Sequence, residues 1–369
     1  MKRLLLSMLF FVATVAAVSC ADEAGPPTPP SSQPTAAATT ALPVEIKPSD
    51  ANVYYVGRFD TRDAAGPRAQ WPGSTVTLRF NGTDLQAKLA GKQYHAVMVD
   101  GKFTSVIVGS KDPELFDIAR GLPAGDHTVS IIRRTESFTG VTQYLAFYLN
   151  EGAKLLEPAK LTRKIEIIGD SITCGYGNEA ANEKQHFAGN TENSAMTYGA
   201  IAAREVGAEY HSIAWSGRKM APNNTMGEIY DRALSQDKTS VWDFKTWTAD
   251  VVVINLSTND FNAKPPPTEE AWVPAYAAFI ERLRKNYPDA MVYVATSPML
   301  SGDRKKTTKA YLEKVIESRK AAGDSKVALL EFPAQSPKDG LGADWHPSVK
   351  THEKMAGILV AKLKEDLKW

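Results

Sequence analysis

Two hydrophobic patterns divide the chain near Pro158. Before this residue, short runs alternate between apolar and polar positions, which is typical of strands with one buried face. Turn dipeptides such as Asn81-Gly82 and Asp100-Gly101 close two of these runs and favour hairpins. We therefore expect a β-sandwich of jelly-roll type over residues 46–158. Its predicted strands cover residues 53–59, 74–80, 84–89, 94–99, 103–108, 126–133 and 144–149.

After Pro158 the apolar runs become continuous and alternate with longer stretches of helical period. Continuous runs rich in β-branched residues indicate strands that are buried on both faces, as in parallel sheets. The helical stretches place apolar residues such as Trp272, Tyr276 and Leu283 on one face. Residues 162–369 are therefore expected to form a three-layer α/β/α sandwich with a parallel sheet, flavodoxin-like in outline. The predicted strands are residues 165–168, 209–214, 251–256, 291–295 and 326–330.

The first 45 residues follow neither pattern. Residues 1–20 begin with Lys2-Arg3, continue with an apolar run and end at Cys20, which predicts an export signal. The small residues before Cys20 resemble a bacterial lipobox, and the resemblance implies lipidation of Cys20 and anchoring in the bacterial cell envelope. The alternative is ordinary cleavage, which would give a periplasmic or secreted protein. Residues 21–45 are rich in Pro, Ser, Thr and Ala, as expected for a flexible linker.

The composition narrows the possible partners. The chain has 369 residues, of which 43% are hydrophobic and 23% charged, so it is globular rather than disordered. Its formal net charge of +1 gives no electrostatic footprint for nucleic acid, and we expect membrane contact only through a lipid anchor. Because one of the two cysteines, Cys20, lies in the export signal, Cys174 has no partner for an internal disulfide after processing.

The candidate chemistry begins at Ser171, which follows the first strand of the predicted parallel sheet in the sequence Gly169-Asp170-Ser171. In open α/β sheets, ligands bind at the carboxyl ends of the strands. A serine at such a position is a candidate nucleophile if a base reaches it. The alternative is a serine that only caps the helix that follows.

Further polar residues follow other strands, and the edge shared by the carboxyl ends of the strands allows them to converge. They supply what acyl transfer needs: Ser171 as nucleophile, His346 as base and Asp344 to orient the imidazole. The backbone amides of Ser171 and Gly217, with the side-chain amide of Asn259, are the candidate oxyanion hole. Trp345 and Trp215 flank this predicted cleft and form either a sugar platform or a wall of the core.

Four segments resemble, in order, the blocks of the SGNH (GDSL-type) hydrolases: residues 169–173, Gly217, Asn259 and residues 344–347. The longer string from Gly169 to Asn178 resembles family 2 of the carbohydrate esterases, as does a β-sandwich placed before the catalytic domain. The resemblance covers the chain from about residue 46 to its end. It implies an O-acetyl esterase that acts on plant polysaccharides such as xylan or glucomannan, with no metal ion and no organic cofactor.

Two positions depart from the pattern of these hydrolases. Ser257 stands where a glycine is usual, and Ala343 stands three residues before His346, where many members place an acid. Asp344 is two residues before His346, so either its carboxylate or a backbone carbonyl orients the imidazole. Two other functions stay open: an SGNH lipase or thioesterase acting on longer acyl chains, and a carbohydrate-binding lipoprotein without catalysis.

Overall fold

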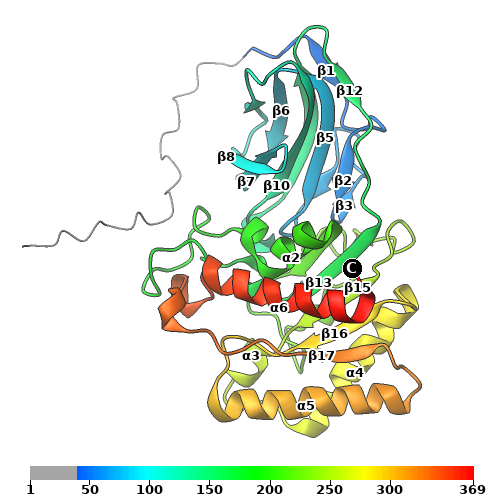
Figure 1. Cartoon of the computed structure of the whole chain (residues 1–369), viewed down its shortest axis with the longest axis vertical. Coiled ribbons are helices and arrows are strands. Elements are labelled where there is room, and N and C mark those ends of the chain that lie inside the picture. Colours follow the sequence, from blue (N-terminus) through cyan, green and yellow to red (C-terminus); the bar gives the residue numbers. More distant parts are fainter. Residues whose placement is uncertain (1–39) are drawn as a thin grey trace, which may run out of the picture. The chain divides into compact units, whose positions relative to one another are not determined.

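The structure, a computed structural model, describes residues 40–369 (Figure 1). Its first part is a sandwich of two antiparallel sheets that enclose one hydrophobic core. One sheet has the order β3 (Phe59–Asp60), β4 (Arg68–Ala69), β11 (Thr142–Leu149), β6 (Leu85–Ala90) and β9 (Glu114–Ala119), and β1 (Val44–Ile46) pairs with β11. The other has the order β12 (Lys154–Leu156), β5 (Thr75–Gly82), β10 (Gly125–Arg133), β7 (Tyr94–Val99) and β8 (Lys102–Val108), and β2 (Tyr54–Val56) pairs with β5.

Alternation of apolar and polar residues builds this sandwich. On β5, Val76, Leu78 and Phe80 are fully buried, whereas the residues between them are partly exposed. The hairpin between β7 and β8 turns at Asp100 and Gly101, whose φ angles of 49° and 78° are those of a type I′ turn. Asn81-Gly82, in contrast, still belongs to β5, and the chain turns only after it.

The predicted β-sandwich is confirmed, but the structure has more strands than the pattern indicates. The run predicted over residues 53–59 is two strands, β2 and β3, because the chain bends at Gly57, where φ is 119°. Four further strands, β1, β4, β9 and β12, had not been predicted. Most of these are only two or three residues long, so their hydrophobic period is too short to detect.

The second part of the chain is a five-stranded parallel sheet with helices on both faces, as predicted. The strand order is β14 (Ala208–Ala214), β13 (Arg163–Gly169), β15 (Val251–Asn255), β16 (Met291–Ala295) and β17 (Val327–Leu330). In chain order this is 2-1-3-4-5, the order of flavodoxin-like folds. The first and third strands therefore lie side by side, and their carboxyl ends bring Ser171 close to the loop that contains Asn259.

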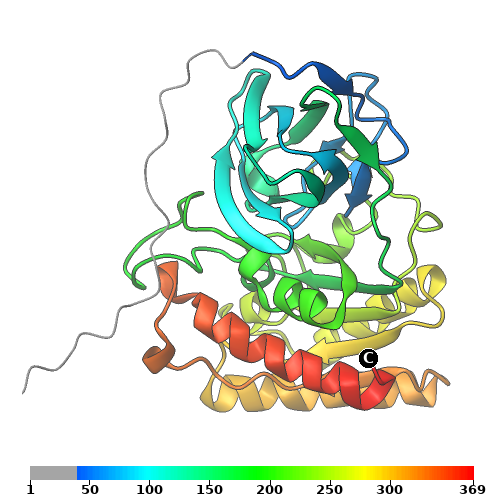
Figure 2. The same ribbon diagram turned by 45° about the horizontal axis from the view of Figure 1, so that its top comes forward.

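Helices cover the two faces of this sheet in pairs. Helix α2 (Tyr198–Val206) and helix α6 (Val349–Leu367) pack against each other on one face, while α4 (Glu269–Asn286) and α5 (Gly302–Ala321) cover the other (Figure 2). Alternate residues of each strand point to the two faces: Ile165 and Ile167 of β13 lie under α2 and α6, and Ile168 lies on the side of α4. Two single-turn helices, α1 (Ser171–Cys174) and α3 (Thr258–Phe261), carry site residues.

The predicted export signal, Cys20 and most of the predicted linker lie outside the described residues. Between residues 40 and 369, no helix combines the length and the apolar character needed to cross a bilayer.

A buried ion pair joins the sandwich to the parallel sheet. Arg58 follows β2, Glu166 is on β13, and their side chains are both fully buried at 2.9 Å. The carboxylate of Glu166 also accepts hydrogen bonds from the hydroxyls of Tyr230 at 2.6 Å and Tyr287 at 3.1 Å. A buried carboxylate with three donors tolerates the low-dielectric interior, but the loss of its cation would leave a charge without compensation.

We expect Arg58→Met to lower the free energy of unfolding by about 3–5 kcal/mol, because it leaves the Glu166 carboxylate buried without a cation. Urea unfolding followed by circular dichroism measures this change. Arg79→Met is the matched control: its salt bridge with Asp126 is solvent-exposed, so its loss should cost less than about 1 kcal/mol. Equal losses in the two variants would contradict the importance given to the buried pair.

Candidate active site

Ser171 is the first residue of α1, directly after β13, and its side chain is almost fully buried. The helix cap is supplied by Asp170, whose Oδ1 accepts the N–H of Ile172 at 3.0 Å. Burial raises the pKa of this Asp170 to about 7. Because Asp170 caps the helix, the hydroxyl of Ser171 is left for another partner, and the capping alternative for Ser171 is wrong.

That partner is His346. Its Nε2 lies 2.8 Å from the Oγ of Ser171, although the two residues are 175 positions apart. Its Nδ1 lies 2.9 Å from the carbonyl oxygen of Ala343. A carbonyl only accepts hydrogen bonds, so Nδ1 carries the proton and Nε2 accepts the hydroxyl of Ser171. Burial lowers the pKa of His346, which favours the neutral imidazole that a general base requires.

Asp344 does not orient this imidazole, contrary to its predicted role. Its carboxylate accepts hydrogen bonds from the hydroxyl of Tyr176 at 2.8 Å and from Nδ1 of His186 at 2.8 Å. The bond with Tyr176 is the main cause of the lowered pKa of Asp344. The physical reason for its placement is the backbone: Asp344 and Trp345 have φ angles of 49° and 59°, a left-handed turn that brings the Ala343 carbonyl to the imidazole instead.

Tyr176 and Gly177 support His346 from the nucleophile side. The Tyr176 ring stacks on the imidazole with the ring centroids 4.2 Å apart. The carbonyl oxygen of Gly177 accepts the N–H of Ala343 at 3.0 Å. A Cβ at Gly177 would lie 2.3 Å from that of Ala343, so only glycine allows this approach. Sequence reasoning missed both supporting roles, although these residues belong to the segment that carries the family resemblance.

The predicted oxyanion residues lie on three segments: Ser171 on α1, Gly217 on the loop after β14, and Asn259 on α3. Asn259, on α3, donates through its Nδ2 to the carbonyl of Arg218 at 3.0 Å and to Oδ2 of Asp170 at 3.4 Å, so it connects the Gly217 loop with the nucleophile loop. Among the hydrogen bonds of residues 40–369, none uses the N–H of Ser171 or of Gly217. Two amides without protein acceptors beside a serine nucleophile are suited to stabilise a developing oxyanion.

Ser257 causes no strain in the loop that carries Asn259. Its φ of −174° lies outside the left-handed region that favours glycine, so the turn does not require glycine at this position.

The two parts of the chain match different families. Residues 55–158 match the carbohydrate esterase 2 N-terminal family, and residues 167–354 match the GDSL-like lipase/acylhydrolase family. A solved structure of a family two carbohydrate esterase from Clostridium thermocellum, in complex with cellohexaose, is 38% identical and superimposes with a TM-score of 0.82. The match covers 86% of this chain and 99% of that one. The chain belongs to carbohydrate esterase family 2.

Two curated relatives of this family 2 esterase have named activities. A cellulase/esterase, CelE, of Acetivibrio thermocellus is 38% identical over 86% of this chain, which spans only 40% of the length of CelE. An acetylxylan esterase/glucomannan deacetylase of Cellvibrio japonicus is 25% identical, and the match covers 88% of this chain and 91% of that protein.

The two tryptophans predicted to flank the cleft differ in exposure. Trp345 is adjacent to His346 and is 56% exposed, which makes its indole accessible beside the base. Trp215 is partly buried, packs against the hydrophobic core and has the guanidinium carbon of Arg218 4.9 Å from the centre of its ring. Of the two predicted platforms, Trp345 has the surface that a sugar ring would need, and Trp215 forms a wall.

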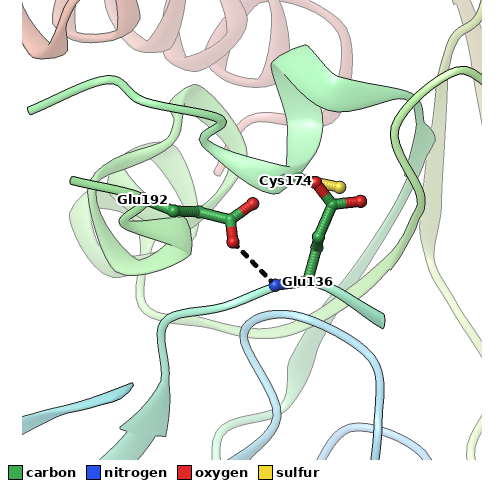
Figure 3. Close-up of side chains that lie close together, drawn as sticks. All are labelled: Glu136, Cys174 and Glu192. Carbon is green, nitrogen blue, oxygen red and sulfur yellow. Dashed lines mark hydrogen bonds between the residues drawn. The ribbon is translucent and has the colours of Figure 1, made fainter. Parts of the chain in front are cut away.

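In the described part of the esterase, one group of three side chains offers metal-ligand atoms close together: Glu136, Cys174 and Glu192, within 4.8 Å of one another (Figure 3). Their chemistry does not fit a metal ion. Both oxygens of Glu136 accept hydrogen bonds from Ser216, and burial raises the pKa of the Cys174 thiol well above its usual range. A protonated thiol is a poor metal ligand.

We expect Asp344→Asn to lower kcat for 4-nitrophenyl acetate by less than about tenfold, because the carbonyl of Ala343, and not this carboxylate, holds the Nδ1 proton. Loss of the orienting acid of a true triad costs about 10⁴-fold. In the wild type and in Asp344→Asn, the lowered pKa of His346 keeps the imidazole neutral down to a pH below its ordinary value of about 6.5. The value of kcat/KM should therefore fall only below that pH, where the base becomes protonated. A loss of a thousandfold or more in a folded Asp344→Asn variant would restore the carboxylate to the role of orienting acid.

Proposed function

We propose that this family 2 esterase removes O-acetyl groups from plant polysaccharides such as xylan or glucomannan. The observation that carries the proposal is the 2.8 Å contact between Oγ of Ser171 and Nε2 of His346, with Nδ1 held by the Ala343 carbonyl. This contact provides a nucleophile and a base in the correct tautomer. The intact pair also argues against a binding protein without catalysis.

In the proposed mechanism, His346 takes the proton of the Ser171 hydroxyl while Oγ attacks the acetyl carbonyl. The N–H groups of Ser171 and Gly217 bind the oxyanion of the tetrahedral intermediate. Asn259 adds a third donor by exchanging its 3.4 Å bond to Oδ2 of Asp170 for one to the oxyanion. The bond between the acetyl carbon and the sugar oxygen breaks, and His346 gives its proton to that oxygen. His346 then takes a proton from a water molecule while the water oxygen attacks the acetyl carbon. The bond between that carbon and Oγ breaks, His346 gives the proton to Oγ, and acetate leaves free Ser171.

Three observations support an acetylated glycan as the substrate. The relative from Cellvibrio japonicus is named as an acetylxylan esterase and glucomannan deacetylase. The similar structure from Clostridium thermocellum holds cellohexaose. The exposed indole of Trp345, next to the base, is placed to stack on a sugar ring.

For the location, we infer that the protein is exported and anchored to the bacterial cell envelope through a lipid on Cys20. The basic start, the apolar run and the cysteine at its end support this inference. The linker that follows would hold the catalytic part away from the membrane surface.

Ser171→Ala should lower acetate release from acetylated xylan or glucomannan by more than about a thousandfold, because it removes the attacking oxygen. Acetate is measured by an enzyme-coupled assay, and circular dichroism checks the fold.

The wild-type enzyme should prefer 4-nitrophenyl acetate to the octanoate ester by more than about tenfold in kcat/KM. Preference for octanoate would favour a lipase or thioesterase, and absence of turnover by the wild type on all these esters would favour a binding protein.

Cys20→Ala should move the protein from the membrane fraction to the soluble fraction of an expressing bacterium, because no other segment is proposed to hold it there. Immunoblots of the two fractions measure the change, and Cys174→Ala is the control with the anchor retained. Recovery of the wild-type protein only in the soluble fraction would contradict the lipid anchor.

A further inference from the structure

A glutamate of the β-sandwich reaches the loop that contains Gly217. Glu136 comes three residues after β10, at the start of a short 3₁₀ turn (Ser137–Thr139), and its side chain is fully buried. Its Oε2 accepts the backbone N–H of Ser216 at 2.8 Å, and its Oε1 accepts the hydroxyl of Ser216. The two residues are 80 positions apart, so this contact joins the two parts of the chain next to the catalytic site.

Ser216 is covalently joined to one of the proposed oxyanion donors. The peptide group between Ser216 and Gly217 carries the Gly217 N–H. Ser216, on the amino side of that peptide, is held by the two hydrogen bonds that it donates to Glu136. Gly217 itself has a φ of 79° and is exposed. Without the bonds from Ser216 to Glu136, this exposed glycine would have more freedom to move its amide away from the oxyanion. Oxyanion donors act only within a narrow distance range, about 2.7–3.1 Å from the reacting oxygen.

The other contacts of Glu136 lie on the nucleophile side (Figure 3). Cys174, whose thiol faces the carboxylate, is the last residue of α1, the helix that begins with Ser171. Glu192 accepts the backbone N–H of Glu136 at 3.0 Å through its Oε2, and its Oε1 is buried without a partner in the described chain. Glu136 is therefore held between the two loops that supply the oxyanion amides.

The carboxyls of Glu136 and Glu192 cannot both be charged at this distance. Burial raises the pKa of both, and the neighbouring charge of Glu136 raises that of Glu192 further, against the opposing effect of Arg133. The two donors of Ser216 oppose the rise at Glu136, and both of its oxygens accept hydrogen bonds from them.

We propose that Glu136 is a positioning residue of the esterase, through which the β-sandwich fixes the Ser216–Gly217 peptide of the oxyanion hole. The proposal rests on the deacetylase function proposed above. It gives the β-sandwich a direct part in catalysis, beside any role in glycan binding. Glu136 touches neither substrate nor Ser171, so it acts only through Ser216.

The first test is Glu136→Ala, assayed with 4-nitrophenyl acetate. We expect kcat to fall by about tenfold to a hundredfold, with KM changed by less than about threefold, because an oxyanion donor acts in the transition state and its complete loss costs about 10²–10³-fold. Glu136→Gln should recover most of the kcat, since its amide oxygen can accept the Ser216 N–H and its amide nitrogen can donate to the hydroxyl. Glu179→Gln is the matched control: it pairs with Arg134 in the same region, has no contact with Ser216, and should keep kcat within about twofold.

Ser216→Ala is a second variant that tests the same contact if Glu136→Ala does not fold. This change at a half-buried position removes only the hydroxyl bond, and kcat should fall about threefold to tenfold at constant KM. An unchanged kcat in a folded Glu136→Ala or in Ser216→Ala, an increase in KM alone, or an equal loss in Glu179→Gln would each overturn the proposal. Wild-type turnover is measured first: its absence overturns the deacetylase itself, whereas an active wild type with unaffected variants overturns only the role of Glu136.

Discussion

The hydrogen bond between Nδ1 of His346 and the carbonyl of Ala343 is the interaction on which the site depends. It decides the tautomer of the imidazole, and the tautomer decides that Nε2 accepts the hydroxyl of Ser171. The surrounding residues preserve this one bond. Gly177 lets Ala343 approach closely, Tyr176 stacks on the ring, and the left-handed residues Asp344 and Trp345 turn the carbonyl inward.

Two buried contacts between the β-sandwich and the parallel-sheet part have different roles. In the core, Arg58 and Glu166 join them through a buried ion pair that acts on stability. Near that edge, Glu136 joins them through Ser216. The first contact is made to a strand inside the core, and the second to a loop at a strand end. Among the contacts between the two parts, the first supports the stability of the fold and the second supports the chemistry.

Much of this architecture could be predicted from the sequence, because its strands have strong periodicity. The strands β7 and β16 were predicted to the residue, since an alternating or continuous apolar run ends at a clear turn in each. The short strands β1, β4 and β12 were missed, because backbone pairing and not hydrophobicity defines them. The meeting of Ser171 and His346 followed from the shared edge of parallel strands. The turn of Asp344 away from the imidazole and the reach of Glu136 depend on backbone angles and on packing between distant segments, which no local pattern contains.

The use of a main-chain oxygen at Ala343 has a consequence for how this active site can change over generations. A catalytic acid is lost by a single missense mutation, but every amino acid at position 343 brings the same carbonyl. The orienting group of the histidine therefore does not depend on the side-chain chemistry of residue 343, but only on a side chain small enough for this buried position. The position most sensitive to mutation is instead Gly177, where any side chain would push away the loop that contains Ala343.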